Sequence, residues 1–239
     1  MTTHGINTFN EKALHLDLKA WYAQPEDQFE VPVDGYIIDL VRGDLLVEIQ
    51  TRNFAAIRPK LTKLIPRHPV KLIFPIPQEK WVVKLADADK PALSRRKSPK
   101  RGVVEHLFQE LIHIPTLLLD PNFSLEVLLI HEEETRRPNE NFRWRRRPWI
   151  TQERRLLRVV GHYCFTTPFD LAALLPADLP TPFTTMDLAT AIGQPRAIAQ
   201  KMAYCLAKLD MIQVVGKQGN AFLYQAFAPS GFPNSRLKA

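Results

Sequence analysis

The sequence predicts an α/β fold followed by a second, mainly helical unit. Three observations support this prediction. Helical and strand-like segments alternate over the first half of the chain, one strand-like segment is apolar at nearly every position, and most segments after residue 150 read as helices. A strand that is apolar on both sides is typical of a sheet covered by helices on both faces. The length of 239 residues is enough for two domains.

Hydrophobic periodicity defines the elements of the α/β part. Apolar residues recur at helical spacing over 8–23 and again over 54–66. Between these two segments, the turn dipeptide Gly43-Asp44 separates two strand-like runs. The first helix opens with a capping box, Thr8 to Glu11. In order, we expect a helix over 8–23, strands over 29–41 and 44–51, a helix over 54–66, a buried strand over 70–76, a further strand or edge over 81–85, a helix over 103–114 and a strand over 124–134.

An arginine- and proline-rich stretch, 136–149, interrupts this pattern and marks a domain boundary. The prediction is a first domain over 1–135, a basic linker over 136–150 and a second domain over 151–239. Within the second domain we expect helices over 151–164, 168–175, 184–192 and 195–209, and two strands within 211–227.

Residues 184–225 contain a short helix, a turn at Gly193, a second helix and a hairpin with a glycine-rich tip. This order resembles a winged helix-turn-helix over about forty residues. The resemblance implies that the second helix contacts DNA bases and that the hairpin contacts phosphate. The residues that it places at DNA are Arg196, Gln200, Lys201 and Lys217. Winged helices also pack against proteins, and that alternative stays open.

Positive charge is concentrated in the middle of the chain. The net charge is +7, and residues 94–158 hold 14 lysines and arginines against 9 aspartates and glutamates. Clustered cations favour a polyanion such as DNA, because neutralised phosphates release counterions. The alternative is a solvated linker. The candidate DNA-binding residues in the two clusters are Arg95, Arg96, Lys97, Lys100, Arg101, Arg145, Arg146 and Arg147.

Composition also limits the setting of the protein. No apolar run is long enough for a membrane span, and residues 1–12 lack the apolar segment of a secretory signal. Two cysteines provide neither a disulfide framework nor a zinc cluster. We therefore expect a protein of the reducing cytoplasm with no membrane partner.

The hairpin over 35–54 carries acids where a plain strand pair would not. If Gly43-Asp44 forms a two-residue turn, Val41 faces Leu46, and Asp39 faces Glu48. Like charges directly opposite each other destabilise a strand pair. A divalent cation would turn that repulsion into coordination, since Mg²⁺ prefers carboxylate oxygens. Alternatively, both acids lie on the solvent face beside surface lysines.

These residues, in the order helix, hairpin, helix, buried strand, resemble the PD-(D/E)XK nuclease superfamily over roughly residues 8–76. The resemblance implies a restriction-endonuclease-like αβββαβ core that binds Mg²⁺ or Mn²⁺ through Asp39 and Glu48. The metal in such a site polarises the scissile phosphate and activates water. The resemblance further places Gln50 at the family's lysine position and Glu11 at the acid that several branches carry on the first helix.

Gln50 departs from that pattern, because an amide can orient water but supplies no positive charge. A lysine of the next helix, Lys60 or Lys63, can take the missing role. The implied function is a metal-dependent DNA endonuclease with a winged helix that binds DNA, and a homodimer is compatible with it. The alternatives are a catalytically inactive DNA-binding or regulatory protein on the same scaffold and a protein-interaction module. The chain also resembles uncharacterised bacterial proteins that join these two domains.

Overall fold

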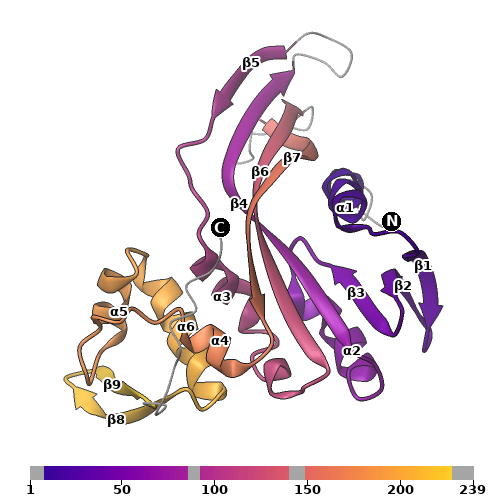
Figure 1. Ribbon diagram of the computed structural model, residues 1–239. Helices are drawn as coiled ribbons and strands as arrows, with labels where there is room; N and C mark the ends of the chain where they lie inside the picture. Colours follow the sequence, from indigo (N-terminus) through magenta and orange to yellow (C-terminus); the bar gives the residue numbers. More distant parts are fainter. Residues whose placement is uncertain (1–7, 86–91, 140–148, 228–239) are drawn as a thin grey trace, which may run out of the picture.

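A seven-stranded mixed sheet forms the centre of the computed structural model, which describes residues 8–85, 92–139 and 149–227 (Figure 1). The strand order is β1-β2-β3-β4-β6-β7, and β5 pairs with β4. In chain order the elements are α1 (Thr8–Tyr22), β1 (Gln28–Val33), β2 (Tyr36–Arg42), β3 (Leu45–Ile49), α2 (Phe54–Leu64), β4 (Val70–Leu85), β5 (Ala92–Lys97), the 3₁₀ helix η1 (Val104–Leu107), α3 (Phe108–Leu111), the 3₁₀ helix η2 (Leu117–Leu119), β6 (Phe123–Pro138), β7 (Trp149–Phe165), α4 (Pro168–Ala172), α5 (Thr185–Ala191), α6 (Arg196–Lys208), β8 (Ile212–Gln218) and β9 (Ala221–Ala226).

The α/β class and the first helix are confirmed, and the predicted hairpin has three strands instead of two. The run 29–41 forms two strands rather than one, because Asp34 and Gly35 both adopt positive φ angles, 48° and 84°, and turn the chain between β1 and β2. Strands β1, β2 and β3 are antiparallel neighbours. The helix α2 follows with an Asn53 cap whose side chain accepts from the Ala56 amide.

Strand β4 is one long strand where the sequence suggested two short ones. It is parallel to β6 over nearly its whole length, with a register shift between Pro77 and Glu79. Its other edge pairs first with β3 and later with β5. The upper parts of β4, β6 and β7 rise with β5 as a narrow arm above the rest of the molecule (Figure 1).

The helix predicted over 151–164 is wrong. These residues form β7, which pairs antiparallel with β6 from Leu125↔Phe165 to Pro138↔Trp149. Exposed and half-buried residues alternate in its second half, as in a strand with one face toward solvent. Pairing with β6 therefore overrides the local helical pattern, and the large sheet continues to Phe165, beyond the linker expected over 136–150. The helix expected over 103–114 is also shorter, a 3₁₀ turn followed by the four residues of α3.

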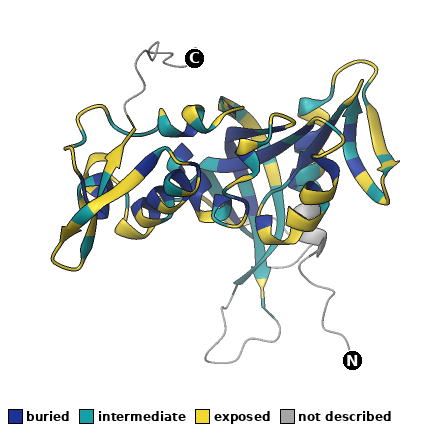
Figure 2. Cartoon of the chain, turned by 90° about the horizontal axis from the view of Figure 1, so that it is seen from below, coloured by how far each residue is buried: buried dark blue, intermediate teal, exposed yellow. Residues whose placement is uncertain are grey.

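The helical unit after β7 shares the core of the sheet. One cluster of buried side chains runs from α2 and the lower sheet through Leu107 and Phe108 to Leu188, Met202 and Leu206 in α5 and α6. The buried residues form a continuous band from the sheet into these helices (Figure 2). The two strands expected within 211–227 are β8 and β9, which form a separate two-stranded sheet.

Helices cover both faces of the large sheet. Leu14 and Leu18 of α1 pack on one face against a cluster that includes Val47, Ile73 and Leu128. Helices α2 and α3 cover the other face as part of the larger cluster. Among the described residues, no helix combines the length and apolar character needed to cross a bilayer.

Candidate functional site

The β2–β3 hairpin opens at the two acids. The pairs Val41↔Leu46 and Leu40↔Val47 confirm the expected register. The recorded pairing ends there, so that β2 continues beside β1 while β3 continues beside β4 with Glu48↔Leu72. Asp39 and Glu48, the next residues in the register, therefore lie where the two strands part.

Asp39 takes the place of a backbone acceptor at this opening. The Leu46 and Gln50 amides bond to carbonyls on the β4 side, so the alternate amide of Ile49 is directed toward β2. It donates to Asp39 Oδ2 at 2.9 Å. This bond fixes the carboxylate between the two strands.

Two residues of α1 also contact Asp39. His15 Nε2 lies 3.0 Å from Oδ2, and Lys19 Nζ lies 3.1 Å from Oδ1. Burial works to raise the pKa of Asp39, but the hydrogen bond and charge of His15, the Ile49 amide and Lys19 outweigh it, and the pKa is lowered. Asp39 is therefore ionised at neutral pH.

Glu48 is buried on β3 with a lysine from α2 beside it. Its side chain is 6% exposed, and Oε1 forms an ion pair with Lys60 Nζ. Lys60 Nζ also donates to the Ile37 carbonyl at 2.5 Å, so its ammonium bridges β2 and β3. Burial and the charge of Asp39 raise the pKa of Glu48 to about 7, and Lys60 offsets only part of that effect.

The raised pKa of Glu48 predicts a pH-dependent stability. A carboxyl with a folded-state pKa near 7 and an ordinary value of 4.5 destabilises the native state as the pH rises between those two values. The free energy of unfolding of Glu48→Gln, relative to wild type, should therefore rise by about 1–3 kcal/mol between about pH 4 and pH 8. Urea denaturation of both proteins across this range measures the effect. A difference that does not change with pH would contradict the burial argument.

Gln50 does not face the carboxylates in the way expected of the lysine position. Its Nε2 donates to the Arg52 carbonyl at 2.5 Å and lies 3.4 Å from the Asn53 carbonyl. The amide thus holds the loop that leads into α2. The cation beside Glu48 comes from Lys60, one of the two lysines proposed from the sequence, whereas Lys63 lies over the Tyr36 ring at 5.2 Å.

Sequence reasoning missed two site residues, His15 and Lys19. They follow Glu11 at intervals of four residues, so the three share one side of α1. That spacing was the available signal, since a helix that presents one residue to the hairpin presents its i+4 neighbours as well. The side chain of Glu11 lies outside the described part of the structure.

The donor set fits a hard divalent cation that keeps most of its water. No group of three or more histidine, cysteine, aspartate or glutamate side chains suited to a metal occurs among the described residues. Mg²⁺, however, is commonly held by one or two carboxylates together with water and substrate phosphate. Glu48 Oε1 is buried, and the contact that the structure gives it is the Lys60 ammonium, which a bound cation would have to replace or share. Asp39 and Glu48 could therefore hold Mg²⁺ or Mn²⁺ at the opening of the hairpin.

The candidate DNA-binding residues fall into separate places. Arg95 and Lys97 lie over the Trp81 ring and pair with Glu133 and Glu79. The side chains of Arg96, Lys100 and Arg101 line a pocket between β4 and the chain after β5. Arg145, Arg146 and Arg147 lie outside the described residues.

The second set lies on the helical unit. Arg196 and Gln200 are exposed on α6, Lys201 is half-buried, and Lys217 of β8 lies over the Phe222 ring at 5.1 Å. Tyr204 and Lys208 were not predicted, yet both are exposed and continue the four-residue spacing of Arg196 and Gln200 along α6. Arg196, Gln200, Tyr204 and Lys208 together form one polar, solvent-facing strip of this helix.

A family model described as a domain of unknown function, DUF8091, matches residues 12–166. The chain belongs to this family. The matched range ends within one residue of the last residue of β7, so the DUF8091 match covers nearly the whole large sheet together with α1, α2 and α3.

One relative extends over both parts of the chain. It is recorded as an uncharacterized protein of Treponema pallidum (strain Nichols), and it is 30% identical over 226 residues, which is 94% of this chain and 88% of the relative. The similarity therefore includes the helical unit that follows the DUF8091 match. No solved structure matches the chain.

Proposed function

We propose that this DUF8091 protein is a metal-dependent DNA endonuclease of the PD-(D/E)XK kind, with Lys60 in place of the usual strand lysine. The observation that carries the proposal is the position of Asp39 and Glu48 where β2 and β3 part, close enough for the charge of Asp39 to raise the pKa of Glu48, with Lys60 paired to Glu48. The element order α1-β1-β2-β3-α2-β4 agrees with the αβββαβ order of that superfamily. Acids of β2 and β3 thus lie at the point where the two strands separate, each with a lysine partner, Lys19 of α1 for Asp39 and Lys60 of α2 for Glu48.

Each of these residues has a definite task in phosphodiester hydrolysis. Asp39 and Glu48 would hold Mg²⁺ or Mn²⁺, which when bound polarises the scissile phosphate and lowers the pKa of a water. Without a metal, burial raises the pKa of Glu48 to about 7, and a bound cation would favour the ionised carboxylate. Lys60 supplies a fixed positive charge to the phosphate oxygens, and the Ile37 carbonyl holds its ammonium in place.

DNA binding is assigned to the helical unit. Helix α6 and the β8–β9 hairpin have the order of a winged helix-turn-helix. The strip formed by Arg196, Gln200, Tyr204 and Lys208 faces solvent, and it combines cations with groups that can hydrogen-bond to base edges. Lys217 on the hairpin adds a phosphate contact, which would be sequence-independent.

A second function has one observation in its favour. Glu48 already pairs with Lys60, and Asp39 with Lys19 and His15, although Lys19 also pairs with Glu30, so both carboxylates have partners without a metal. This pairing is compatible with a scaffold that has lost cleavage and kept DNA binding, because the acids are stabilised without a metal. In that case the protein is a DNA-binding regulator.

Plasmid nicking distinguishes the two functions. With Mg²⁺ or Mn²⁺ the wild-type protein should nick supercoiled DNA, and Asp39→Asn and Glu48→Gln should each lower the rate by at least about 100-fold, because removal of either carboxylate weakens the metal site. Asp44→Asn is the matched control, since this acid lies in the exposed turn of the same hairpin. Salt-dependent DNA binding without metal-dependent nicking would support the regulator instead, and absence of DNA binding at low salt would contradict both.

A further inference from the structure

A pocket of about 550 Å³ lies on the arm, away from the hairpin, between β4, the chain after β5, His106 and Arg136. Ligand pockets of proteins usually have volumes of this order. Two backbone hydrogen bonds, which anchor the chain after β5 to β4, determine the position of the pocket. Ser98 N donates to the Lys80 carbonyl at 2.7 Å, and Gly102 N donates to the Pro77 carbonyl at 3.0 Å. Between these anchors the chain arches away from β4 and leaves a hollow.

Gly102 makes the second anchor possible. A Cβ atom at this position would lie 2.3 Å from the Pro77 carbonyl oxygen, which is too close for any larger residue without movement of the backbone. The close approach therefore fixes the lower end of the arch against β4. The pocket is a built feature of this segment.

The lining of the pocket is strongly basic. Five of its residues are lysines or arginines, and none of its lining residues within the described chain is an aspartate or glutamate; the five are Lys80, Arg96, Lys100, Arg101 and Arg136. An anion in the pocket would therefore meet positive charge on several sides.

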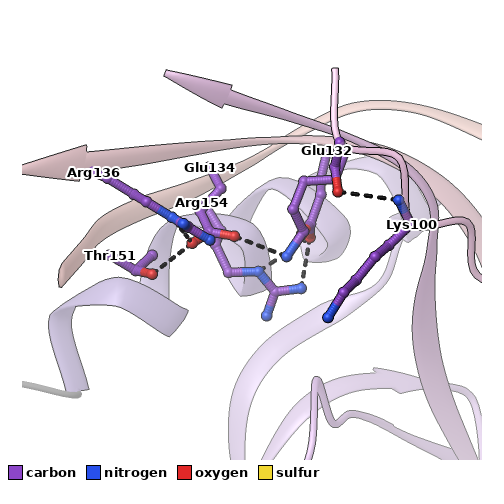
Figure 3. A network of polar contacts seen from close by, with 8 residues as sticks. Lys100, Glu132, Glu134, Arg136, Thr151 and Arg154 are labelled. Carbon is purple, nitrogen blue, oxygen red and sulfur yellow. Dashed lines mark hydrogen bonds and ion pairs between the residues drawn. The ribbon is translucent and has the colours of Figure 1, made fainter. Parts of the chain in front are cut away.

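Carboxylates behind the pocket neutralise only part of this charge. Lys80 pairs with Glu132 and Glu134 at 2.9 and 2.8 Å, and Arg136 pairs with Glu134 at 2.7 Å (Figure 3). Burial opposes ionisation of Glu134, but the hydrogen bonds from Arg136, Lys80 and Thr151 lower its pKa to about 2. The two cations that Glu134 contacts are thereby held in place and compensated.

Arg96 and Lys100 are not compensated in this way. No carboxylate of the described chain lies within ion-pair distance of either side chain, and the ammonium of Lys100 makes no dashed contact in Figure 3. Arg101 has only a 3.5 Å contact with Glu79, which also binds Lys97. Two uncompensated charges match the two negative charges of a phosphate monoester better than the single charge of a diester.

The rest of the lining suits an organic group attached to that phosphate. Ile76 and Val82 are buried side chains of β4, and Pro77 and Pro99 complete an apolar wall. A free inorganic anion would gain nothing from this wall, whereas a sugar or base would bury apolar surface on it. A nucleotide combines both parts.

We propose that this pocket binds a nucleotide through its terminal phosphate, with Arg96 and Lys100 as the residues that recognise the phosphate. The nucleotide is either free or the phosphorylated end of a DNA strand, since both present the same phosphate monoester. The proposal does not depend on cleavage at Asp39 and Glu48, because the pocket lies on the arm and its test is direct binding.

The strand β5 offers a matched control. Val82↔Arg96 are cross-strand partners on the pocket side, whereas Arg95 and Lys97 contact the Trp81 ring. The double variants R96Q/K100Q and R95Q/K97Q therefore remove the same charge from different faces of the arm. Thermal unfolding of both variants checks that each remains folded.

Calorimetric titration of the full chain with adenosine 5′-monophosphate tests the proposal, with adenosine as the ligand that lacks phosphate. We expect the dissociation constant for the monophosphate to rise at least about 10-fold in R96Q/K100Q and less than about 3-fold in R95Q/K97Q, because charge-assisted hydrogen bonds are lost only in the first. Adenosine should bind much more weakly than the monophosphate. Absence of binding, equal binding of adenosine, or equal losses in the two variants would each overturn the proposal.

Competition identifies the source of the phosphate. A short oligonucleotide with a 5′-phosphate that displaces the monophosphate, where the same oligonucleotide with a 5′-hydroxyl does not, would assign the pocket to a strand end. Displacement by neither oligonucleotide would assign it to a free nucleotide. Equal displacement by both would overturn the recognition of a terminal phosphate.

Discussion

Replacing Lys60 by methionine is expected to lower metal-dependent cleavage by at least about 100-fold, the size of effect seen when one preorganised charge-stabilising donor is removed from an active site. Lys60 is the cation paired with Glu48, and its ammonium also binds the Ile37 carbonyl. Methionine keeps the length and the apolar stem of lysine but supplies no positive charge. The loss should therefore appear mainly in kcat. Plasmid nicking under single-turnover conditions measures it.

Lys63 provides the control on the same helix. It lies over the Tyr36 ring and has no recorded contact with the two acids in the described structure. Lys63→Met should keep nicking within about 3-fold of wild type, since an exposed cation–π contact contributes only about 0.5–1 kcal/mol. Equal losses in the two variants would show that general charge on α2, rather than the position of Lys60, supports cleavage.

A second substitution tests whether Lys60 has taken over the lysine position of the strand. Gln50 follows Glu48 by two residues, directly after β3, and its amide still bonds to the Ile73 carbonyl of β4, so a lysine at this position starts from the side of the sheet that carries Glu48. Adding Gln50→Lys to Lys60→Met should recover at least about 10-fold of the lost rate, because a positive charge returns to the site. No recovery, with the double variant folded, would mean that the ammonium must bridge β2 and β3.

The acidic pair could be predicted from the sequence because its position depends on local rules. The turn Gly43-Asp44 sets the register, and Asp39 and Glu48 are the residues that follow its last pair, Leu40↔Val47. The opening of the hairpin could not be predicted, since it depends on β2 and β3 following different neighbours. Likewise His15 and Lys19 become site residues only through the packing of α1 on the sheet.

Strand β7 could not be predicted from its own sequence pattern. Its residues have a helix-compatible pattern, and the arginine- and proline-rich stretch before it indicates a domain boundary rather than a hairpin with the strand predicted over 124–134; pairing with β6 decides the structure. The same pairing also decides how far the acids in the run Glu132–Glu134 are exposed to solvent. As a surface strand it would carry solvated acids, but with β7 on one side and β4 on the other, Glu132 and Glu134 are buried.

Glu132→Gln is therefore expected to destabilise the protein by about 2–4 kcal/mol. The side chain of Glu132 is 0% exposed, and it pairs with Lys80 at 2.9 Å and Arg154 at 2.5 Å (Figure 3). Removal of one partner of a buried ion pair is costly because the remaining charges stay buried without compensation. Lys80 and Arg154 are partly exposed, so water relieves some of that cost. Urea denaturation at neutral pH measures the change in free energy of unfolding.

The neighbouring residue is the control. Glu133 points to the other side of β6 and pairs with Arg95, whose side chain is 51% exposed. Glu133→Gln should change the free energy of unfolding by less than about 1 kcal/mol, as is usual for a surface ion pair. Similar losses at both positions would contradict the burial argument, since the two variants remove the same charge one residue apart.

A double substitution separates the value of the buried charges from the cost of leaving them unpaired. Glu132→Met with Arg154→Met removes the acid and one of its cations together, while Lys80 keeps its contact with Glu134. Well-packed apolar residues often replace a buried ion pair with no loss of stability. The double variant should therefore be more stable than Glu132→Gln by at least about 1 kcal/mol. Such a result would mean that the buried network fixes the positions of Lys80 and Arg136 beside the basic pocket more than it stabilises the arm.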